Sequence, residues 1–208
     1  YYFKIKYSDD NGVHCSSYIE VTDPPSGGSV YTNGLRQLLN GGTVKDENNV
    51  EYTLPKKADN QNEVDLDKIE GIEFANENGL NKPTSDGTLE QDILWGDEYK
   101  AWETIRPHIK FLSLRNYIRD TYPGDTYFGN MTKVEKLELP ECGIIVGNGE
   151  GQKNYMYFSN NDNLNEITIW SAKKNASVDI TQYEGKVLQN SVGEYMFSNC
   201  YNLSTKYI

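Results

Sequence analysis

Short runs of alternating apolar and polar residues recur through the second half of the chain. Leu137 and Leu139 are separated by one polar residue, and so are Ile167 and Ile169. Successive side chains of a strand point to opposite faces, so each pair lies on one face of a short β-strand. The segment before each strand is short and polar with one aromatic anchor, which predicts a single helical or 3₁₀ turn leading into the strand.

These runs belong to an internal repeat. Phe128-Gly129-Asn130-Met131 aligns with Phe158-Ser159-Asn160-Asn161 and with Phe197-Ser198-Asn199-Cys200, and two weaker copies precede them. Units this small cannot bury their own apolar side, so we expect them to stack, with their strands in a parallel sheet and their phenylalanine row inside. The intervals between the middle apolar positions are 40, 25, 30 and 39 residues, and these positions are Ile72, Leu112, Leu137, Ile167 and Lys206.

The segment "FSNCYNL" and the strand ending Leu137-Glu138-Leu139-Pro140 resemble the BspA-type leucine-rich repeat. The resemblance is clear over residues 100–208 and weak from residue 65. It implies an α/β fold, an irregular leucine-rich-repeat solenoid over residues 29–208, with short parallel strands and short helical or 3₁₀ turns. It also implies a bacterial protein that is secreted or held at the outer cell surface.

The first part of the chain follows a different pattern. Residues 1–23 alternate around the turn Asp10-Asn11-Gly12, which predicts a β-hairpin. We expect residues 1–28 to form a small β module, the tail of an immunoglobulin-like domain, or the N-terminal cap of the solenoid. Further elements are predicted as a short helix, a strand and the longest helix, at residues 34–42, 50–55 and 95–108.

Charge narrows the range of partners. The net charge is −11, and residues 1–100 carry 19 acidic and 9 basic side chains against 12 and 11 in residues 101–208. Nucleic acid would be repelled by the first half and not attracted by the second. No apolar run approaches the length of a membrane span, so membrane attachment would need an anchor outside this chain.

Catalytic and metal-binding motifs are absent from the sequence. His14 and His108 lie 94 residues apart, and the three cysteines form no C-x-x-C pair, so we expect no metal and no cofactor. Serine-nucleophile and phosphate-loop motifs are missing. Two suitably placed carboxylates suffice for a glycosidase, which leaves a hydrolase open as a minor alternative among Asp65, Asp67, Glu70 and Glu73.

The remaining candidate is the outward face of the repeat strands. Residues that alternate with the core positions form a ladder of mixed charge with aromatic ends, and the chain holds 16 Tyr and 3 Trp, a composition that suits recognition surfaces. The resemblance to the BspA-type repeat implies adhesion or protein recognition at the cell surface, host extracellular proteins included. We therefore expect a non-catalytic binding protein that recognises a protein partner through this face, with a carbohydrate ligand as the alternative. The predicted contact residues are Phe111, Arg115, Lys136, Glu138, Glu166, Thr168, Trp170 and Tyr207.

Overall fold

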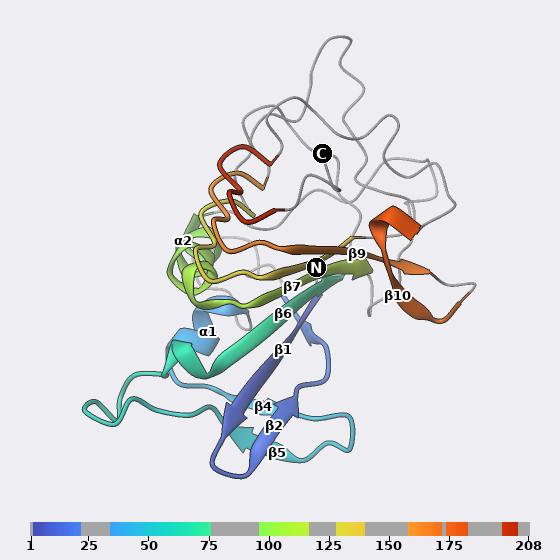
Figure 1. Cartoon of the computed structure of the whole chain (residues 1–208). Coiled ribbons are helices and arrows are strands. Elements are labelled where there is room, and N and C mark those ends of the chain that lie inside the picture. Colours follow the sequence, from blue (N-terminus) through green and yellow to red (C-terminus); the bar gives the residue numbers. More distant parts are fainter. Residues whose placement is uncertain are drawn as a thin grey trace.

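One mixed, curled sheet organises the chain (Figure 1). The computed structural model describes residues 2–21, 34–75, 96–116, 128–139, 158–171, 174–182 and 197–203. Seven strands follow one another in the order β10-β9-β8-β7-β6-β1-β2, while β3 also pairs with β1, and β4 and β5 form a separate pair. The strands are β1 (Tyr2–Asp9), β2 (Gly12–Cys15), β3 (Ile19–Glu20), β4 (Thr43–Lys45), β5 (Glu51–Thr53), β6 (Ile69–Ala75), β7 (Phe111–Asn116), β8 (Lys136–Leu139), β9 (Glu166–Ser171) and β10 (Ala176–Asp179).

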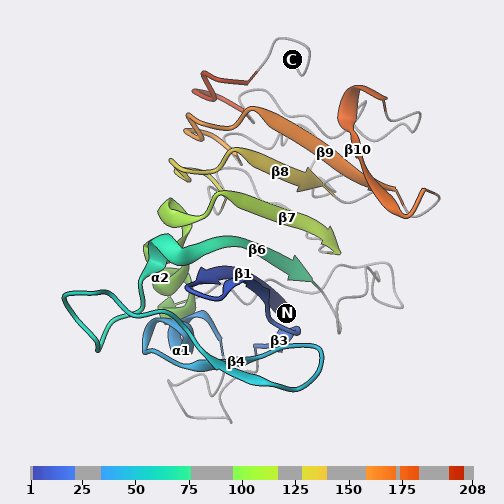
Figure 2. The same ribbon diagram turned by 60° about the horizontal axis from the view of Figure 1, so that its bottom comes forward.

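The centre of the sheet is parallel, and its four strands share the register that the repeat predicted. Strands β6, β7, β8 and β9 run in the same direction (Figure 2). The middle positions of the aligned copies lie side by side across these strands, and they are Ile72, Leu112, Leu137 and Ile167. All four side chains are buried, so this row forms one line of the core.

Aromatic rings form a second line of the core, as the repeat also predicted. Phe128 stacks on Phe158 with 6.2 Å between ring centroids, and Phe158 stacks on Phe197 at 5.4 Å. Trp102 continues the line at 6.0 Å from Phe128, edge to face. Phe128 and Phe158 are fully buried, so these residues are core and not a ligand site.

An asparagine occupies the same strained position in each of the three turns. Asn130, Asn160 and Asn199 have φ angles of 56°, 58° and 60°, in the left-handed region that asparagine tolerates better than most residues. The Asn160 amide donates to Asn130 Oδ1 at 3.0 Å, and the Asn199 amide donates to Asn160 Oδ1 at 2.8 Å. We call the turn segments 128–134, 158–164 and 197–203 the turn column. Asparagine at this position therefore has two roles. It adopts the left-handed backbone conformation of the turn, and its side chain hydrogen-bonds to the next turn.

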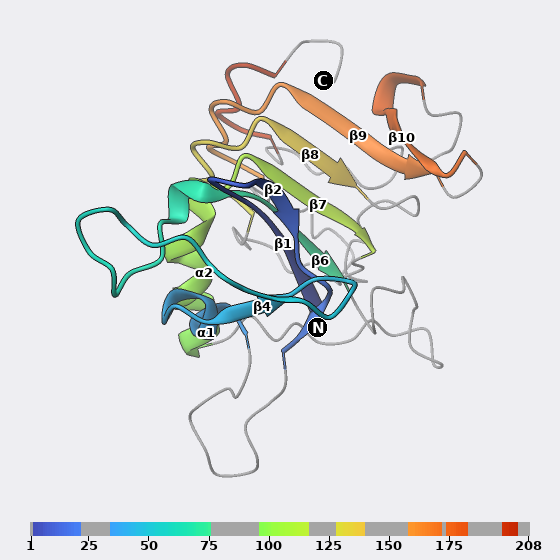
Figure 3. The same ribbon diagram turned by 90° about the horizontal axis from the view of Figure 1, so that it is seen from below.

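The expected repeat solenoid is wrong. The sheet is a curled half-barrel whose antiparallel strands flank the parallel centre at both ends (Figure 3). Strand β10 turns back on β9 through a tight hairpin that includes Asn175 at φ 49°, and a chain that reverses in this way cannot add a further parallel strand there. The segments before β8 and β9 are hydrogen-bonded β-turns and not helical turns, with bonds such as Leu164 N–H to Asn161 O at 3.0 Å.

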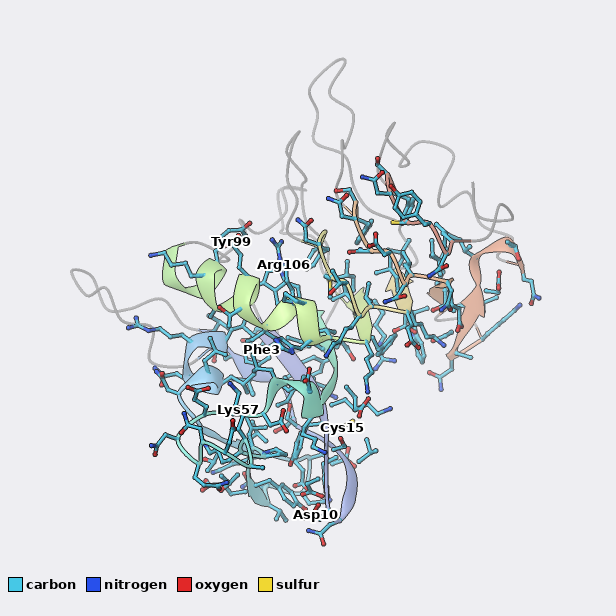
Figure 4. All side chains as sticks on the ribbon, turned by 60° about the vertical axis from the view of Figure 1, so that its left-hand side comes forward. Phe3, Asp10, Cys15, Lys57, Tyr99 and Arg106 are labelled. Atoms are coloured by element: carbon cyan, nitrogen blue, oxygen red, sulfur yellow. The ribbon has the colours of Figure 1, made fainter. Side chains whose placement is uncertain are left out.

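The predicted hairpin is confirmed, and it joins the main sheet. Strand β1 pairs antiparallel with β2 around Asp10 and Asn11, and its other edge pairs antiparallel with β6. Figure 4 places Asp10 at the hairpin tip and Phe3 beneath the helix that carries Tyr99. Phe3 is fully buried, so the hairpin contributes to the same core as the repeats.

The helices are few and short among the described residues. Both α-helices lie where the sequence predicted them, and α2 inserts Trp102 against Phe74 of β6 at 5.1 Å. A 3₁₀ turn that contains Pro107 follows α2 directly, because a proline cannot donate the hydrogen bond that would continue the α-helix. The helices are α1 (Leu35–Leu39), α2 (Gly96–Ile105), η1 (Leu66–Lys68), η3 (Arg106–His108) and η4 (Ile180–Gln182).

Candidate functional site

The face of the sheet opposite the core carries the candidate site. Its side chains alternate with the buried rows along each strand, so they come from β1 and from the four parallel strands. We call this surface the polar face, and it comprises Lys4, Glu73, Phe111, Ser113, Arg115, Lys136, Glu138, Glu166, Thr168 and Trp170. All predicted contact residues except Tyr207 are members, and Tyr207 lies outside the described residues.

The first row of the polar face is an open ion-pair row. Phe111, Lys136 and Glu166 lie side by side on β7, β8 and β9, as the repeat alignment predicted. Lys136 Nζ lies 2.8 Å from Glu166 Oε1, and both side chains are about two-fifths exposed, at 40% and 42%. An exposed pair of this kind contributes little to stability, so this row is a solvent-facing surface.

The second row is buried, although the alternation predicted outward-pointing side chains there. Glu138 and Thr168 are only 3% and 4% exposed. Ser113 Oγ donates to one oxygen of the Glu138 carboxylate at 2.7 Å, and Ser177 of β10 donates to the other. Glu138 thus reaches across β9 to β10. The Thr168 hydroxyl is buried and has no hydrogen-bond partner among the described residues.

The third row contains a cation–π contact between Arg115 and Trp170. The Arg115 guanidinium lies over the Trp170 ring, with 4.4 Å from its central carbon to the ring centroid. Arg115 Nε donates to Glu73 Oε1 at 3.3 Å, and the Tyr18 hydroxyl donates to the same oxygen. Lys4 Nζ lies 4.3 Å from the centre of the Tyr18 ring. Two cations and two aromatic rings therefore alternate across the sheet.

The electrostatics of this cluster hold Arg115 in its charged form. Burial disfavours the charge on the guanidinium, but the nearby carboxylates Glu73 and Glu138 outweigh burial and raise the pKa of Arg115 above its usual value. The Arg115 side chain is 29% exposed and that of Glu73 is 14% exposed. The pair is therefore only partly screened by water, and it fixes the position of Arg115 more firmly than a surface ion pair would.

Sequence analysis missed several members of this cluster. Glu73 precedes Phe74 in the weakest repeat copy, and the sequence indicated it only as one of the carboxylates that leave a hydrolase open. Tyr18 follows β2, and Ser177 lies on β10, so both come from the antiparallel flanks. No repeat spacing relates those flanks to the central strands, and the sequence offers no signal that would have found them.

A second cluster of ionisable residues links η1 to the end of α2 and to the turn column. Asp67 accepts from His108 Nδ1 at 2.8 Å and also pairs with Lys133. The hydrogen bonds from Lys133 and His108 lower the pKa of Asp67 from 3.8 to about 2. His108 belongs to η3 and Lys133 to the segment before β8, so this cluster connects η1 to both of these segments.

A polar cavity of about 270 Å³ lies beside the β1–β2 hairpin. Its wall includes His14 and Tyr52, whose rings lie 5.2 Å apart. His14 Nε2 lies 2.9 Å from Asp9 Oδ1, which lowers the pKa of Asp9. Within the described residues, His, Cys, Asp and Glu side chains form no group of three suited to a metal ion.

Searches against family models, curated proteins and solved structures found no match for this chain. The resemblance to the BspA-type repeat therefore stays a prediction. In the part of the chain that the structure describes, the helices are too short or too polar to cross a bilayer. The case for function rests on the polar face itself.

Proposed function

We propose that this protein is a non-catalytic binding protein that recognises a partner protein through its polar face. The observation that carries this proposal is the Arg115–Trp170 stack, in which a partly exposed guanidinium is fixed over an indole ring. Arginine, tryptophan and tyrosine are the residues that contribute most to the energy of protein interfaces. Here Arg115, Trp170 and Tyr18 lie in one connected cluster.

Preorganisation supports the proposal. Binding costs free energy when flexible side chains must be ordered at an interface. Arg115 is already held by Glu73 and by Trp170, so part of that cost is met when the chain folds. Around this cluster, Phe111 and the Lys136–Glu166 pair give an open rim of mixed polarity. A fixed centre with a polar rim is the usual anatomy of a protein interface.

Carbohydrate binding is the second candidate, and one observation favours it. The unpartnered hydroxyl of Thr168 lies two residues before Trp170 on the same face, beside the carboxylate of Glu138. Hydroxyls, carboxylates and an indole ring are groups that can hydrogen-bond to and stack on a sugar. One face of the Trp170 ring is already covered by Arg115, which weakens this candidate relative to a protein partner.

A carboxylate-based hydrolase is less well supported. Glu73 and Glu138 are the two carboxylates nearest Arg115, and each accepts hydrogen bonds from groups of the protein itself. Glu138 is also buried, which leaves it poorly placed to exchange a proton with a substrate. This arrangement favours a role in holding the polar face together.

A binding screen with a matched pair of variants tests the proposal. The purified chain is assayed against an array of extracellular proteins and against a glycan array, and hits are measured by biolayer interferometry. Trp170→Ala should weaken binding to a protein hit about tenfold or more. Tyr201→Ala, which removes an aromatic ring that is 78% exposed on the turn column, should leave that binding unchanged.

Each outcome of the screen has a defined meaning. A protein hit that Trp170→Ala weakens supports the proposal, provided that circular dichroism shows an intact fold. A glycan hit weakened by the same variant replaces the proposal with carbohydrate binding. A hit that only Tyr201→Ala weakens, or no hit on either array, contradicts a binding role for the polar face.

A further inference from the structure

We infer that Arg115 is the specificity-determining residue of the polar face, and that it binds a side-chain carboxylate of an acidic peptide segment of the partner. This inference rests on the proposed function and names the chemistry of its ligand. The inference rests on the contacts of Arg115. Its Nε–H group donates to Glu73, whereas its Nη1 and Nη2 groups have no acceptor among the described residues.

Two parts of the guanidinium are already occupied. Its Nε–H group donates to Glu73 Oε1 at 3.3 Å, which fixes the rotation of the group about its stem. Its central carbon lies over the Trp170 ring, 4.4 Å from the ring centroid, which limits how far the group can move. Tyr18 donates to the same carboxylate oxygen and so holds Glu73 in place from the other side.

The end of the guanidinium remains open. A guanidinium has five N–H donors, and four of them are on Nη1 and Nη2. Among the described residues no acceptor lies within hydrogen-bond distance of these four donors. The side chain is 29% exposed, so this end of the group meets solvent. Arg115 therefore presents a fixed pair of nitrogen donors at the surface of the sheet.

A carboxylate is the ligand that best complements this pair of donors. Its two oxygens match the spacing of Nη1 and Nη2 and can form two parallel charge-assisted hydrogen bonds. Lys136 of β8 and Lys110, just before β7, are less suitable, because Lys136 is paired with Glu166 at 2.8 Å and Lys110 with Glu70 at 3.1 Å. Lys4 lies over the Tyr18 ring, and an ammonium group has no planar pair of donors. Among the described cations of this region, Arg115 is thus the one that can offer a carboxylate two parallel donors.

The local carboxylates restrict the ligand further. Glu73 and Glu138 accept hydrogen bonds from Tyr18, Ser113 and Ser177, so they are not positioned to bind a cationic group of the partner. The net charge of −11 repels an acidic segment at long range. Recognition would therefore depend on the hydrogen bonds between Arg115 and the carboxylate of the partner. Association would be slow, because there is little electrostatic steering.

An oligoglutamate peptide with acetylated and amidated ends is the probe for this inference. Oligoglutamine of the same length tests whether the charge is needed, and oligogalacturonate tests an acidic sugar. Each probe is titrated by calorimetry, and the Nε–H resonance of Arg115 is followed by NMR. We expect oligoglutamate to bind and to shift this resonance, and the other two probes to bind at least about tenfold more weakly.

Three variants separate Arg115 from surface charge in general. Arg115→Lys keeps the charge but loses the planar pair of donors, and Arg115→Gln loses both. Lys57→Gln removes one positive charge from an exposed site that is not part of the polar face. Oligoglutamate binding should fall about tenfold or more in both Arg115 variants and less than about twofold in Lys57→Gln. Circular dichroism melting curves check that the variants are folded.

Several results would overturn the inference. Equal losses in Arg115→Gln and Lys57→Gln would reduce the effect to general surface charge. Binding that survives Arg115→Lys would show that two fixed donors are not needed, and equal binding of oligoglutamine or oligogalacturonate would reject the acidic peptide. A protein hit from the screen that needs Trp170 but tolerates Arg115→Lys would overturn this inference while the proposed function stands.

Discussion

In the turn column, the asparagine and phenylalanine side chains contact their own equivalents in the next copy. Asn160 bonds to Asn130 and to Asn199, and Phe158 stacks on Phe128 and on Phe197. On the polar face, contacts join unlike residues from unrelated segments, such as Glu138 of β8 with Ser177 of β10. Contacts between equivalent residues follow from a repeated sequence, whereas contacts between unlike residues depend on how the flanking strands fold back.

The largest expected effect comes from breaking the stack of rings. Phe158→Ala removes a fully buried ring that contacts both neighbouring copies, so the free energy of unfolding should fall by about 3–5 kcal/mol in urea denaturation. Tyr201→Ala is the control, because this ring is 78% exposed and its removal should change stability by less than about 0.5 kcal/mol. Similar losses in the two variants would contradict a structural role for the stack.

An intermediate effect is expected on the polar face. Ser177→Ala takes one donor from the buried carboxylate of Glu138, and the free energy of unfolding should fall by about 1–3 kcal/mol. In a Glu138→Gln background the same change should cost less, because a neutral amide loses less when it lacks a donor. A double-mutant cycle by urea denaturation measures the difference. Equal costs in both backgrounds would show that the bond does not contribute.

The smallest effect is a pH dependence at Asp67, where the turn column meets η1 and η3. The pKa of Asp67 is lowered to about 2, so its pairing stabilises the fold above its ordinary value of 3.8 and is lost as the pH falls through about 2. Asp67 is 60% exposed, so the contribution should stay below about 1 kcal/mol.

Thermal unfolding of the wild type and Asp67→Asn measures this dependence. The wild type should be the more stable protein above about pH 4, and the two should converge between about pH 4 and pH 2. His108→Gln and Lys133→Gln should each remove part of that change, because each deletes one of the groups that lower the pKa. If the difference in stability between the wild type and Asp67→Asn did not change between about pH 4 and pH 2, the pairing of Asp67 would be ruled out.

The part of the fold that the sequence predicts is the part that repeats. Alignment on Phe128, Phe158 and Phe197 predicts two features, the row of middle positions across β6 to β9 and the contacts between the rings. Both follow because equivalent positions of stacked repeat copies lie side by side. The solenoid was wrong because antiparallel strands flank the parallel centre, where β1 pairs with β6 and β10 pairs with β9. Neither pairing affects the repeat spacing, so the repeat could not indicate them.

Prediction of the site was limited in the same way. Alternation along the strands predicts that Arg115 and Trp170 point away from the core. It does not predict that the arginine crosses from β7 to the ring on β9, because the length of an arginine side chain allows many partners. Tyr18 and Ser177 complete the cluster from flanking segments, and only the folded sheet brings them to it.

The asparagine ladder has a consequence for how this chain can vary over evolutionary time. Its rungs are separated by 30 residues between Asn130 and Asn160 and by 39 residues between Asn160 and Asn199, yet both side-chain bonds are the same. Each of these hydrogen bonds needs only two neighbouring turns. The length of chain between the turns is therefore free to change at a small entropic cost. Insertions and deletions should therefore accumulate between the turns, while Asn130, Asn160 and Asn199 are retained.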